Sequence, residues 1–147
     1  MEKNQTNLED HLCFSLYAGS RAILRLYRPY LDKLQLTYPQ YLVLVTLWEK
    51  PKSTIKEIGI ALDLDTGTLT PLLRRMESLG LVERRRDTVD ERVVNIHITQ
   101  AGKDLQEKAT CIPESLLEAS GMKKNEMDEV NTLIKNLLHQ LNKREAR

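Results

Sequence analysis

Residues 54–99 read TIKEIGIALDLDTGTLTPLLRRMESLGLVERRRDTVDERVVNIHIT. Thr54 and Glu57 have the T-x-x-E spacing of a capping box, which marks the start of a helix. A short helix should follow, because Ile55, Ile58 and Leu62 then lie on one face. The stretch therefore begins with one capped amphipathic helix, which ends at a polar turn over residues 63–65.

A second helix is predicted after this turn, since apolar residues recur at helical spacing up to Gly80, a typical C-terminal cap. Pro71 is tolerated only near a helix start, so this helix should begin close to Gly67 or Thr68. The apolar positions are Leu69, Leu72, Leu73, Met76 and Leu79. Two short helices joined by a tight turn form a helix-turn-helix.

A β-hairpin is predicted next. Residues 81–86 and 92–99 are β-like runs, with Val94, Ile96 and Ile98 in alternation, and the charged residues 87–91 form the turn between them. A helix-turn-helix followed by a hairpin is typical of a winged helix-turn-helix. The predicted fold class is mainly α with a small β-hairpin wing, assembled as a dimer.

The flanking segments read as further helices. Apolar residues recur at helical spacing over residues 8–34, with a bend expected at Pro29. A second helix should start at Thr37, which can form a capping box with Gln40, and should end before Pro51. Beyond the hairpin, a helix begins near residue 100, Pro113 interrupts it, and a last amphipathic helix spans about 127–141. We expect one domain over 1–147, with a DNA-binding lobe over about 37–99. The dimerisation helices are expected over about 8–34 and 101–147.

Composition limits the class of protein. The chain has 147 residues, 41% hydrophobic and 29% charged, with a net charge of +1. No apolar run approaches the roughly 20 residues that a membrane helix needs, and no secretory leader is evident, so we expect a cytoplasmic protein. Its two cysteines and three histidines lack metal-ligand spacing, so we expect neither a metal nor a cofactor.

The predicted second helix presents a polar face opposite its apolar stripe. Thr66, Thr70 and Arg74 are stacked at i, i+4 and i+8, with Thr68 and Arg75 beside them. Hydroxyl and guanidinium groups can contact base edges or phosphates. Each residue alone could equally belong to a solvated surface or a helix cap, so the prediction of DNA binding rests on the order of the elements.

The hairpin turn lies between arginines. Arg84, Arg85 and Arg86 precede it, and Arg92 follows it. An arginine at a wing tip can enter a narrow minor groove. Asp90 is expected to orient Arg92 rather than to contact DNA.

Several stretches together resemble the organic hydroperoxide resistance repressors of the MarR family, and the resemblance spans nearly the whole chain. They are LCFSLY (12–17), LTYPQY (36–41), LDTGTLTPLLRRME (64–77) and DER (90–92). Thr66 stands where that group usually has serine, so the hydroxyl is retained. The resemblance implies a homodimeric repressor of double-stranded operator DNA that senses organic hydroperoxides through Cys13.

A second group of candidate residues consists of Cys13 and the tyrosines that could contact its sulfur. Cys13 lies near a helix start, where unpaired N–H groups favour a thiolate, and Tyr17 at i+4 shares its face. The resemblance implicates Tyr27 and Tyr38 as hydroxyl donors to the sulfur. Because Tyr27 follows Cys13 by 14 residues, or ~21 Å of helix, only the Tyr27 of a partner subunit could reach it. Phe14 and Tyr41 are expected in the core.

The resemblance leaves the second step of oxidation open. Cys111 is a candidate resolving thiol, and a low-molecular-weight cellular thiol is the alternative.

A rival hypothesis is that Cys13 is buried and inert, and that the protein is a regulator controlled by a small aromatic ligand. A thiol peroxidase is not favoured, because no threonine and arginine flank Cys13 to polarise a peroxide. We therefore predict that the protein is not an enzyme.

Overall fold

The computed structural model describes residues 7–145, which form two compact units. The first unit runs to Thr110 and the second starts at Cys111. The first contains η1 (Leu8–Asp10), α1 (Leu12–Lys33), α2 (Tyr38–Glu49), β1 (Lys52–Thr54), α3 (Ile55–Leu62), α4 (Thr66–Ser78), β2 (Val82–Arg86), β3 (Val94–Ile98) and α5 (Gln100–Ala109). The second contains α6 (Ile112–Ser120) and α7 (Lys124–Glu145). None of the helices within residues 7–145 is both long and apolar enough to cross a membrane.

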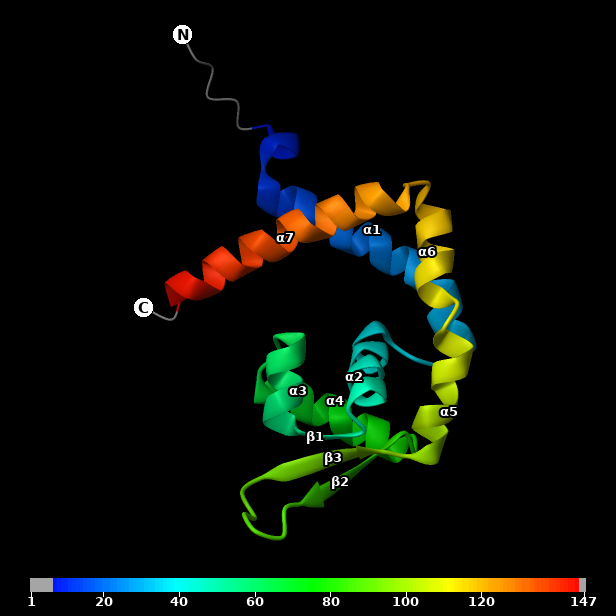
Figure 1. Ribbon diagram of the computed structural model, residues 1–147, viewed down its shortest axis with the longest axis vertical. Coiled ribbons are helices and arrows are strands. Elements are labelled where there is room, and N and C mark those ends of the chain that lie inside the picture. Colours follow the sequence, from blue (N-terminus) through cyan, green and yellow to red (C-terminus); the bar gives the residue numbers. More distant parts are fainter. Residues whose placement is uncertain (1–6, 146–147) are drawn as a thin grey trace. The chain divides into compact units, whose positions relative to one another are not determined.

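The core of the first unit lies where α2, α3 and α4 meet the sheet (Figure 1). The predicted stripe of α4 is buried there except for Leu79, which caps the helix and is exposed. Apolar side chains from the neighbouring elements complete this core: Leu44 and Leu47 of α2, Ile58 of α3, and Val82 and Ile96 of the sheet. Burial of these large side chains is the main source of the lobe's stability.

Both predicted capping boxes form. Thr37 Oγ1 accepts from the Gln40 backbone N–H, and Gln40 Oε1 accepts from the Thr37 N–H at 3.0 Å. Thr54 and Glu57 make the equivalent pair at the start of α3. These side chains satisfy N–H groups that would otherwise have no acceptor, so they determine where α2 and α3 begin.

The sheet has three strands, where the sequence indicated two. Its order is β1-β3-β2, and both pairings are antiparallel, with Val82 opposite Ile98 and Ser53 opposite Ile96. β1 has only three residues, too few for an alternation pattern to be visible in the sequence. The wing strands are also shorter than predicted, so that Arg92 lies in the loop.

Three helix boundaries differ from the prediction. A break at His11 separates the 3₁₀ turn η1 from α1, so the first helix does not run unbroken from residue 8. α4 begins at Thr66, slightly earlier than predicted, because Asp65 caps it. Pro113 does not mark a simple interruption: it lies in the first turn of α6, where its missing N–H costs nothing.

Gly102 allows α5 to pack closely on the hairpin. A Cβ at this position would lie 2.5 Å from the Leu81 carbonyl oxygen and 2.7 Å from Ile98 Cγ1. The Gly102 carbonyl also accepts a 2.9 Å hydrogen bond from Trp48 Nε1 of α2. One small residue thus joins α2, α5 and the sheet.

We predict that Gly102→Ala lowers the free energy of unfolding by about 1–3 kcal/mol, because the added methyl group overpacks against backbone. Chemical denaturation at a fixed protein concentration measures this change. Gly67→Ala is the matched control, since the nearest atom to its Cβ is 3.8 Å away and alanine favours helix. Equal effects of the two substitutions would contradict the close-packing argument.

Candidate nucleic-acid interface and cysteine site

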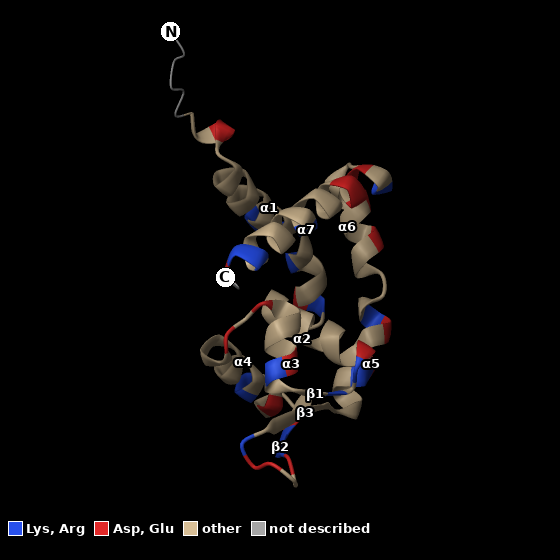
Figure 2. Cartoon of the chain, turned by 60° about the vertical axis from the view of Figure 1, so that its left-hand side comes forward, with Lys and Arg blue, Asp and Glu red and all other residues tan. Residues whose placement is uncertain are grey.

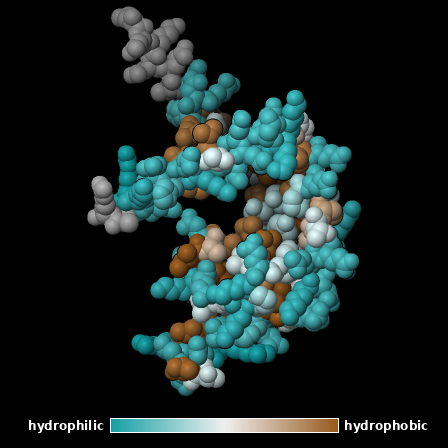
Figure 3. All heavy atoms as spheres, in the orientation of Figure 1, coloured by the Kyte–Doolittle hydropathy of each residue, from teal (hydrophilic) through white to brown (hydrophobic). Residues whose placement is uncertain are grey.

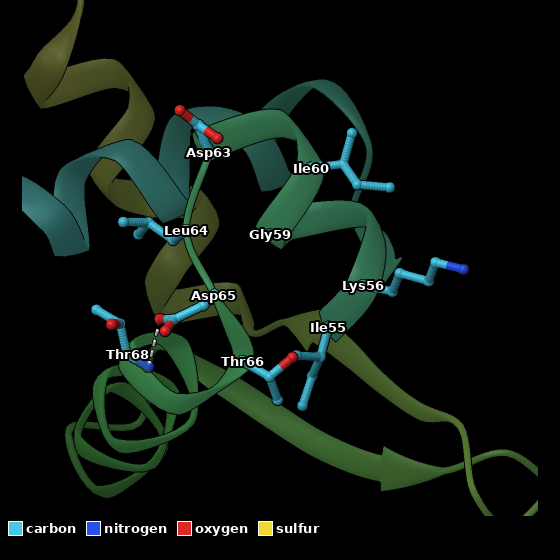
Figure 4. A pocket seen from close by; sticks show the side chains of 9 residues that line it. All are labelled: Ile55, Lys56, Gly59, Ile60, Asp63, Leu64, Asp65, Thr66 and Thr68. Carbon is cyan, nitrogen blue, oxygen red and sulfur yellow. Dashed lines mark hydrogen bonds between the residues drawn. The ribbon is translucent and has the colours of Figure 1, made fainter. Parts of the chain in front are cut away.

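The turn between α3 and α4 is held by local contacts (Figure 4). Asp65 Oδ1 accepts a 2.9 Å hydrogen bond from the Thr68 backbone N–H. Hydrogen bonding from Thr68, first from its side chain and then from its backbone, lowers the pKa of the Asp65 carboxyl. Asp63 adopts a left-handed conformation with φ of 53°, which ends α3. Gly59 lies against the turn, since its Cβ would be 2.8 Å from the Leu64 carbonyl oxygen. The direction of α4 relative to α3 is thereby set.

The outer face of α4 carries the residues predicted for it. Thr66, Thr68, Arg74 and Arg75 are exposed and Thr70 is half-buried, all outside the buried stripe. Lys56, in the first turn of α3, lies beside Thr66 and Thr70 in one surface groove, and the sequence reasoning missed it. The sequence did offer an indication of this exposed position, because Lys56 lies on the side of the helix opposite the apolar residues Ile55 and Ile58.

The hairpin divides its arginines between two faces. Side chains alternate along a strand, so Arg84 and Arg86 share the face of buried Val82, while Arg85 lies on the other face. Arg85 forms an ion pair with Glu83 on that face. The three consecutive arginines therefore do not share one surface.

Asp90 contacts Arg92 as expected. Arg92 Nε donates to Asp90 Oδ1 at 3.1 Å, and Nη2 donates to Oδ2 at 3.3 Å. These bonds lower the pKa of the Asp90 carboxyl, while the Arg92 side chain remains 91% exposed. Basic residues along β2 and acidic residues in the loop are visible in Figure 2. Contact of any of these residues with DNA stays a prediction.

Cys13 is exposed and is the second residue of α1, within its first turn. The backbone N–H groups of a first turn have no acceptor within the helix. Tyr17, one turn later, is 62% exposed and stacks under the Arg21 guanidinium, whose carbon lies 5.5 Å from the ring centroid. Phe14 is 38% exposed, so the expectation that it belongs to the core is wrong for the single chain.

Tyr27 and Tyr38 form one aromatic cluster with Tyr41. The Tyr27 ring centroid lies 4.9 Å from that of Tyr38 and 5.9 Å from that of Tyr41, which is buried as expected. Burial, together with the two neighbouring phenols, raises the pKa of Tyr27 to about 12. Burial likewise raises the pKa of Tyr38 and of Tyr41. All three phenols are neutral hydrogen-bond donors at physiological pH.

Within one chain the structure does not bring the cysteine and this cluster together. Cys13 and Tyr27 both belong to α1, and 14 residues of helix separate them by ~21 Å. Tyr38 lies beside Tyr27, so it is at the same end of α1. Cys111 is exposed and belongs to the second unit.

Comparison with known proteins identifies similar chains. Residues 25–109 match the family described as transcriptional regulator SarA/Rot. The organic hydroperoxide resistance transcriptional regulator of Bacillus subtilis is 46% identical over 137 residues, 93% of each chain.

Solved structures of similar fold include DNA complexes. Reduced AbfR bound to DNA, a Staphylococcus epidermidis protein, matches with a TM-score of 0.79 and 38% identity over 97% of each chain. AbfR has also been solved in overoxidized and disulfide-formed states. A mutant of E. coli MarR with operator DNA matches with a TM-score of 0.81 and 25% identity, over 92% of this chain and 99% of that one.

The raised pKa of Tyr27 predicts a pH dependence of stability. Folding favours the neutral phenol, so the stability that Tyr27 contributes is complete below pH 10.0 and is lost as the pH rises towards about 12. The free energy of unfolding should therefore fall more steeply over this window in the wild type than in Tyr27→Phe. Denaturation curves and phenolate absorbance, recorded in parallel, measure both quantities. Parallel curves for the two proteins would show that Tyr27 titrates normally.

Proposed function

The chain belongs to the MarR family of winged-helix transcriptional regulators, and on that premise we propose that it is a redox-sensing repressor, which binds operator DNA as a homodimer and releases it when organic hydroperoxide oxidises Cys13. The observation that carries this proposal is an exposed cysteine in the first turn of α1, in a chain that also has a complete winged lobe. Sensor and DNA-binding elements thus occur in one small protein.

The DNA-binding part rests on the geometry of the lobe. α4 buries one face and exposes Thr66, Thr70 and Arg74 on the other, which suits a helix that enters the major groove. The hairpin carries Arg92, oriented by Asp90, which suits entry into the adjacent minor groove. Similar chains have been solved bound to DNA.

The homodimer is supported by apolar side chains that a single chain leaves in water. Leu12, Tyr17 and Ile23 of α1 are exposed, and Figure 3 shows apolar atoms at the surface over the start of this helix. α7 likewise exposes a row of large apolar residues, Val130, Leu133, Leu138 and Leu141. Surfaces of this kind indicate interaction sites. A two-fold dimer with antiparallel α1 helices would bring each Cys13 towards the partner's Tyr27.

The proposed chemistry has two steps. The Cys13 thiolate attacks the peroxide bond, the sulfur becomes a sulfenic acid and the hydroperoxide leaves as an alcohol. A second thiol, from Cys111 or a low-molecular-weight compound, then displaces water and forms a disulfide. The changed sulfur no longer accepts hydrogen bonds from the Tyr27 and Tyr38 phenols as a thiolate does. The subunits shift, and the two α4 helices lose the spacing that successive major grooves require.

We predict that Cys13→Ser folds and binds operator but no longer releases it after organic hydroperoxide, because a hydroxyl group is not oxidised in this way. Fluorescence anisotropy of a labelled duplex, selected by the wild type from a random pool, measures release. Cys111→Ser is the matched control, because it retains Cys13. Intact-mass spectrometry should still show that this variant gains one oxygen atom at Cys13 after treatment. Release from the Cys13→Ser protein would exclude Cys13 as the sensor.

A heterodimer experiment tests whether Tyr27 acts on the partner's cysteine. Cys13→Ser is placed on one subunit, and Tyr27→Phe on either the same or the opposite subunit, so that one Cys13 remains. With both changes on one chain, the remaining Cys13 faces phenylalanine and should oxidise roughly tenfold more slowly, because a hydrogen bond to a charged group is lost. With the changes on different chains it faces an intact Tyr27 and should react at the normal rate.

Stopped-flow oxidation of the purified heterodimers measures the two rates. The two arrangements contain the same substitutions, so general destabilisation affects both equally. Equal rates would rule out a sensing site shared between subunits.

A further inference from the structure

Three arginines surround a hollow on the surface of α1. Arg21, Arg25 and Arg28 line this hollow together with Leu24, and all three arginines are exposed. The helix has four basic residues and one acidic residue, so it carries a charge of +3, whereas the whole chain carries only +1. Positive charge is therefore concentrated on α1, and the arginines of the hollow supply most of it.

The folded chain leaves these arginines without an anionic partner. Within residues 7–145, none of the three is in an ion pair. Arg25 follows Arg21 by four residues and precedes Arg28 by three, so the like charges lie next to one another and repel. An anion in the hollow would relieve this repulsion and would accept charge-assisted hydrogen bonds. The hollow thus has the composition of an anion-binding site.

The hollow does not belong to the surface proposed to contact DNA. α1 packs against α2, and α2 lies between α1 and the sheet with its hairpin (Figure 1 and Figure 2). The arginines of α1 are therefore remote from the wing. A phosphate of bound DNA is not the anion that this hollow would take.

The hollow lies on one flank of α1, beside Cys13. A helix turns by ~100° per residue, which places Arg21 and Arg28 within ~80° of Cys13 around the axis. Two of the exposed apolar residues that support the homodimer, Leu12 and Ile23, lie ~80–100° from Cys13 in the opposite direction. Cys13 is thus at the boundary between an apolar flank, which a second subunit can cover, and a basic flank.

Arg21 is the arginine of the hollow that lies nearest to Cys13 in the helix. Its guanidinium carbon lies 5.5 Å from the centroid of the Tyr17 ring, and Tyr17 follows Cys13 by only ~6 Å of helix. The Arg21 side chain therefore leans towards the turn that carries Cys13. A guanidinium stacked on an aromatic ring retains its in-plane N–H donors, so it can still bind a carboxylate.

The position beside Cys13 identifies the class of ligand. Oxidised Cys13 needs a second thiol in the proposed function, and small thiols derived from cysteine carry carboxylates. We propose that this hollow binds the carboxylate of the low-molecular-weight thiol that forms a mixed disulfide with Cys13, and that Arg21 makes the first contact. Such a thiol needs several bonds between its sulfur and its carboxylate in order to span this distance.

The bond changes of this step balance. The thiol sulfur attacks the Cys13 sulfur, an S–S bond forms, and the S–O bond of the sulfenic acid breaks. The hydroxyl group leaves as water with the proton of the thiol. The thiol is oxidised and the Cys13 sulfur is reduced, and the organic hydroperoxide has already supplied the oxidising equivalents.

This inference rests on the oxidation of Cys13 in the proposed function, and it names a small anionic thiol rather than Cys111 as the second thiol. A hydroperoxide that bears a carboxylate could present the same anion to the hollow. The experiments therefore examine the oxidation step and the thiol step separately.

The first experiment measures whether the thiol step depends on the charge of the thiol. Cys111→Ser, which lacks the competing cysteine, is oxidised with cumene hydroperoxide, freed of excess peroxide and mixed with 6-mercaptohexanoate or 6-mercaptohexan-1-ol. These two thiols are matched in length and in thiol acidity. Quenched-flow mixing with intact-mass spectrometry follows the mixed disulfide. The carboxylate thiol should react roughly tenfold faster, and KCl should reduce this advantage.

The second experiment assigns the advantage to the hollow. In the Cys111→Ser background, Arg21→Gln should bring the ratio of the two rates close to one, and Arg25→Gln should lower it as well. Arg21→Glu should reverse the preference, so that 6-aminohexane-1-thiol reacts faster than 6-mercaptohexanoate. Lys33→Gln is the matched control, because it removes one positive charge from the far end of the same helix and should leave the ratio unchanged.

A ratio of rates cancels any effect of a substitution on the reactivity of Cys13 itself. Circular dichroism establishes that the variants are folded, which is expected because the substituted side chains are exposed. Equal rates for the two thiols, or an equal fall of the ratio in Arg21→Gln and Lys33→Gln, would overturn the thiol site while oxidation of Cys13 stands.

The oxidation step is measured with cumene hydroperoxide and with its para-carboxylate derivative. A preference for the carboxylate derivative in this step alone, lost in Arg21→Gln, would assign the hollow to the peroxide and overturn the proposal. A protein in which Cys13 forms no sulfenic acid would overturn both this inference and the proposed function.

Discussion

The apolar stripe of α4 is the constraint on which the rest of the lobe depends. Leu69, Leu73 and Met76 are fully buried, so α4 cannot rotate about its axis without exposing them. Their burial forces Thr66 and Arg74 outward. Hydrophobic packing thus determines which polar side chains can meet a nucleic acid, although the packed residues contact none. The Glu77 carboxylate at the end of the same helix then holds Arg84, and with it the hairpin.

The sequence predicted those parts of the fold that depend on local chemistry. The capping boxes of α2 and α3, the Asp65 turn and the buried stripe of α4 are all encoded within a few residues. By contrast, β1 exists because it pairs with β3, a strand some forty residues later, and no local pattern reveals it. The same reason explains the arginines of the hairpin. Their division between two faces follows from strand pairing, which a run of like charges in a sequence does not display.

α1 determines the geometry of the candidate sensing site through its length. A continuous helix holds Cys13 and Tyr27 at a fixed separation, and the aromatic cluster of Tyr27, Tyr38 and Tyr41 forms at one end only. The sequence was sufficient for this separation, because helical rise is constant. It did not show that Tyr27 and Tyr38 are adjacent, since that contact depends on how α1 packs on α2. A cluster of neutral phenols is well suited to hydrogen-bond a thiolate, but the Cys13 of the same chain lies too far along α1 to be that thiolate.

Residues 83–92 of the hairpin contain four arginines and four acidic residues, so the hairpin has no net charge, and this fits the proposed switch. A strongly basic wing would hold DNA by long-range attraction, which falls off gradually with distance and tolerates small displacements of a subunit. Hydrogen bonds from a guanidinium to a phosphate are instead lost within about an ångström of misalignment. A regulator that must release DNA after one sulfur atom is oxidised benefits from contacts of the second kind. Arg92 is suited to such a contact, because hydrogen bonds from its guanidinium to the Asp90 carboxylate orient it while its side chain remains 91% exposed.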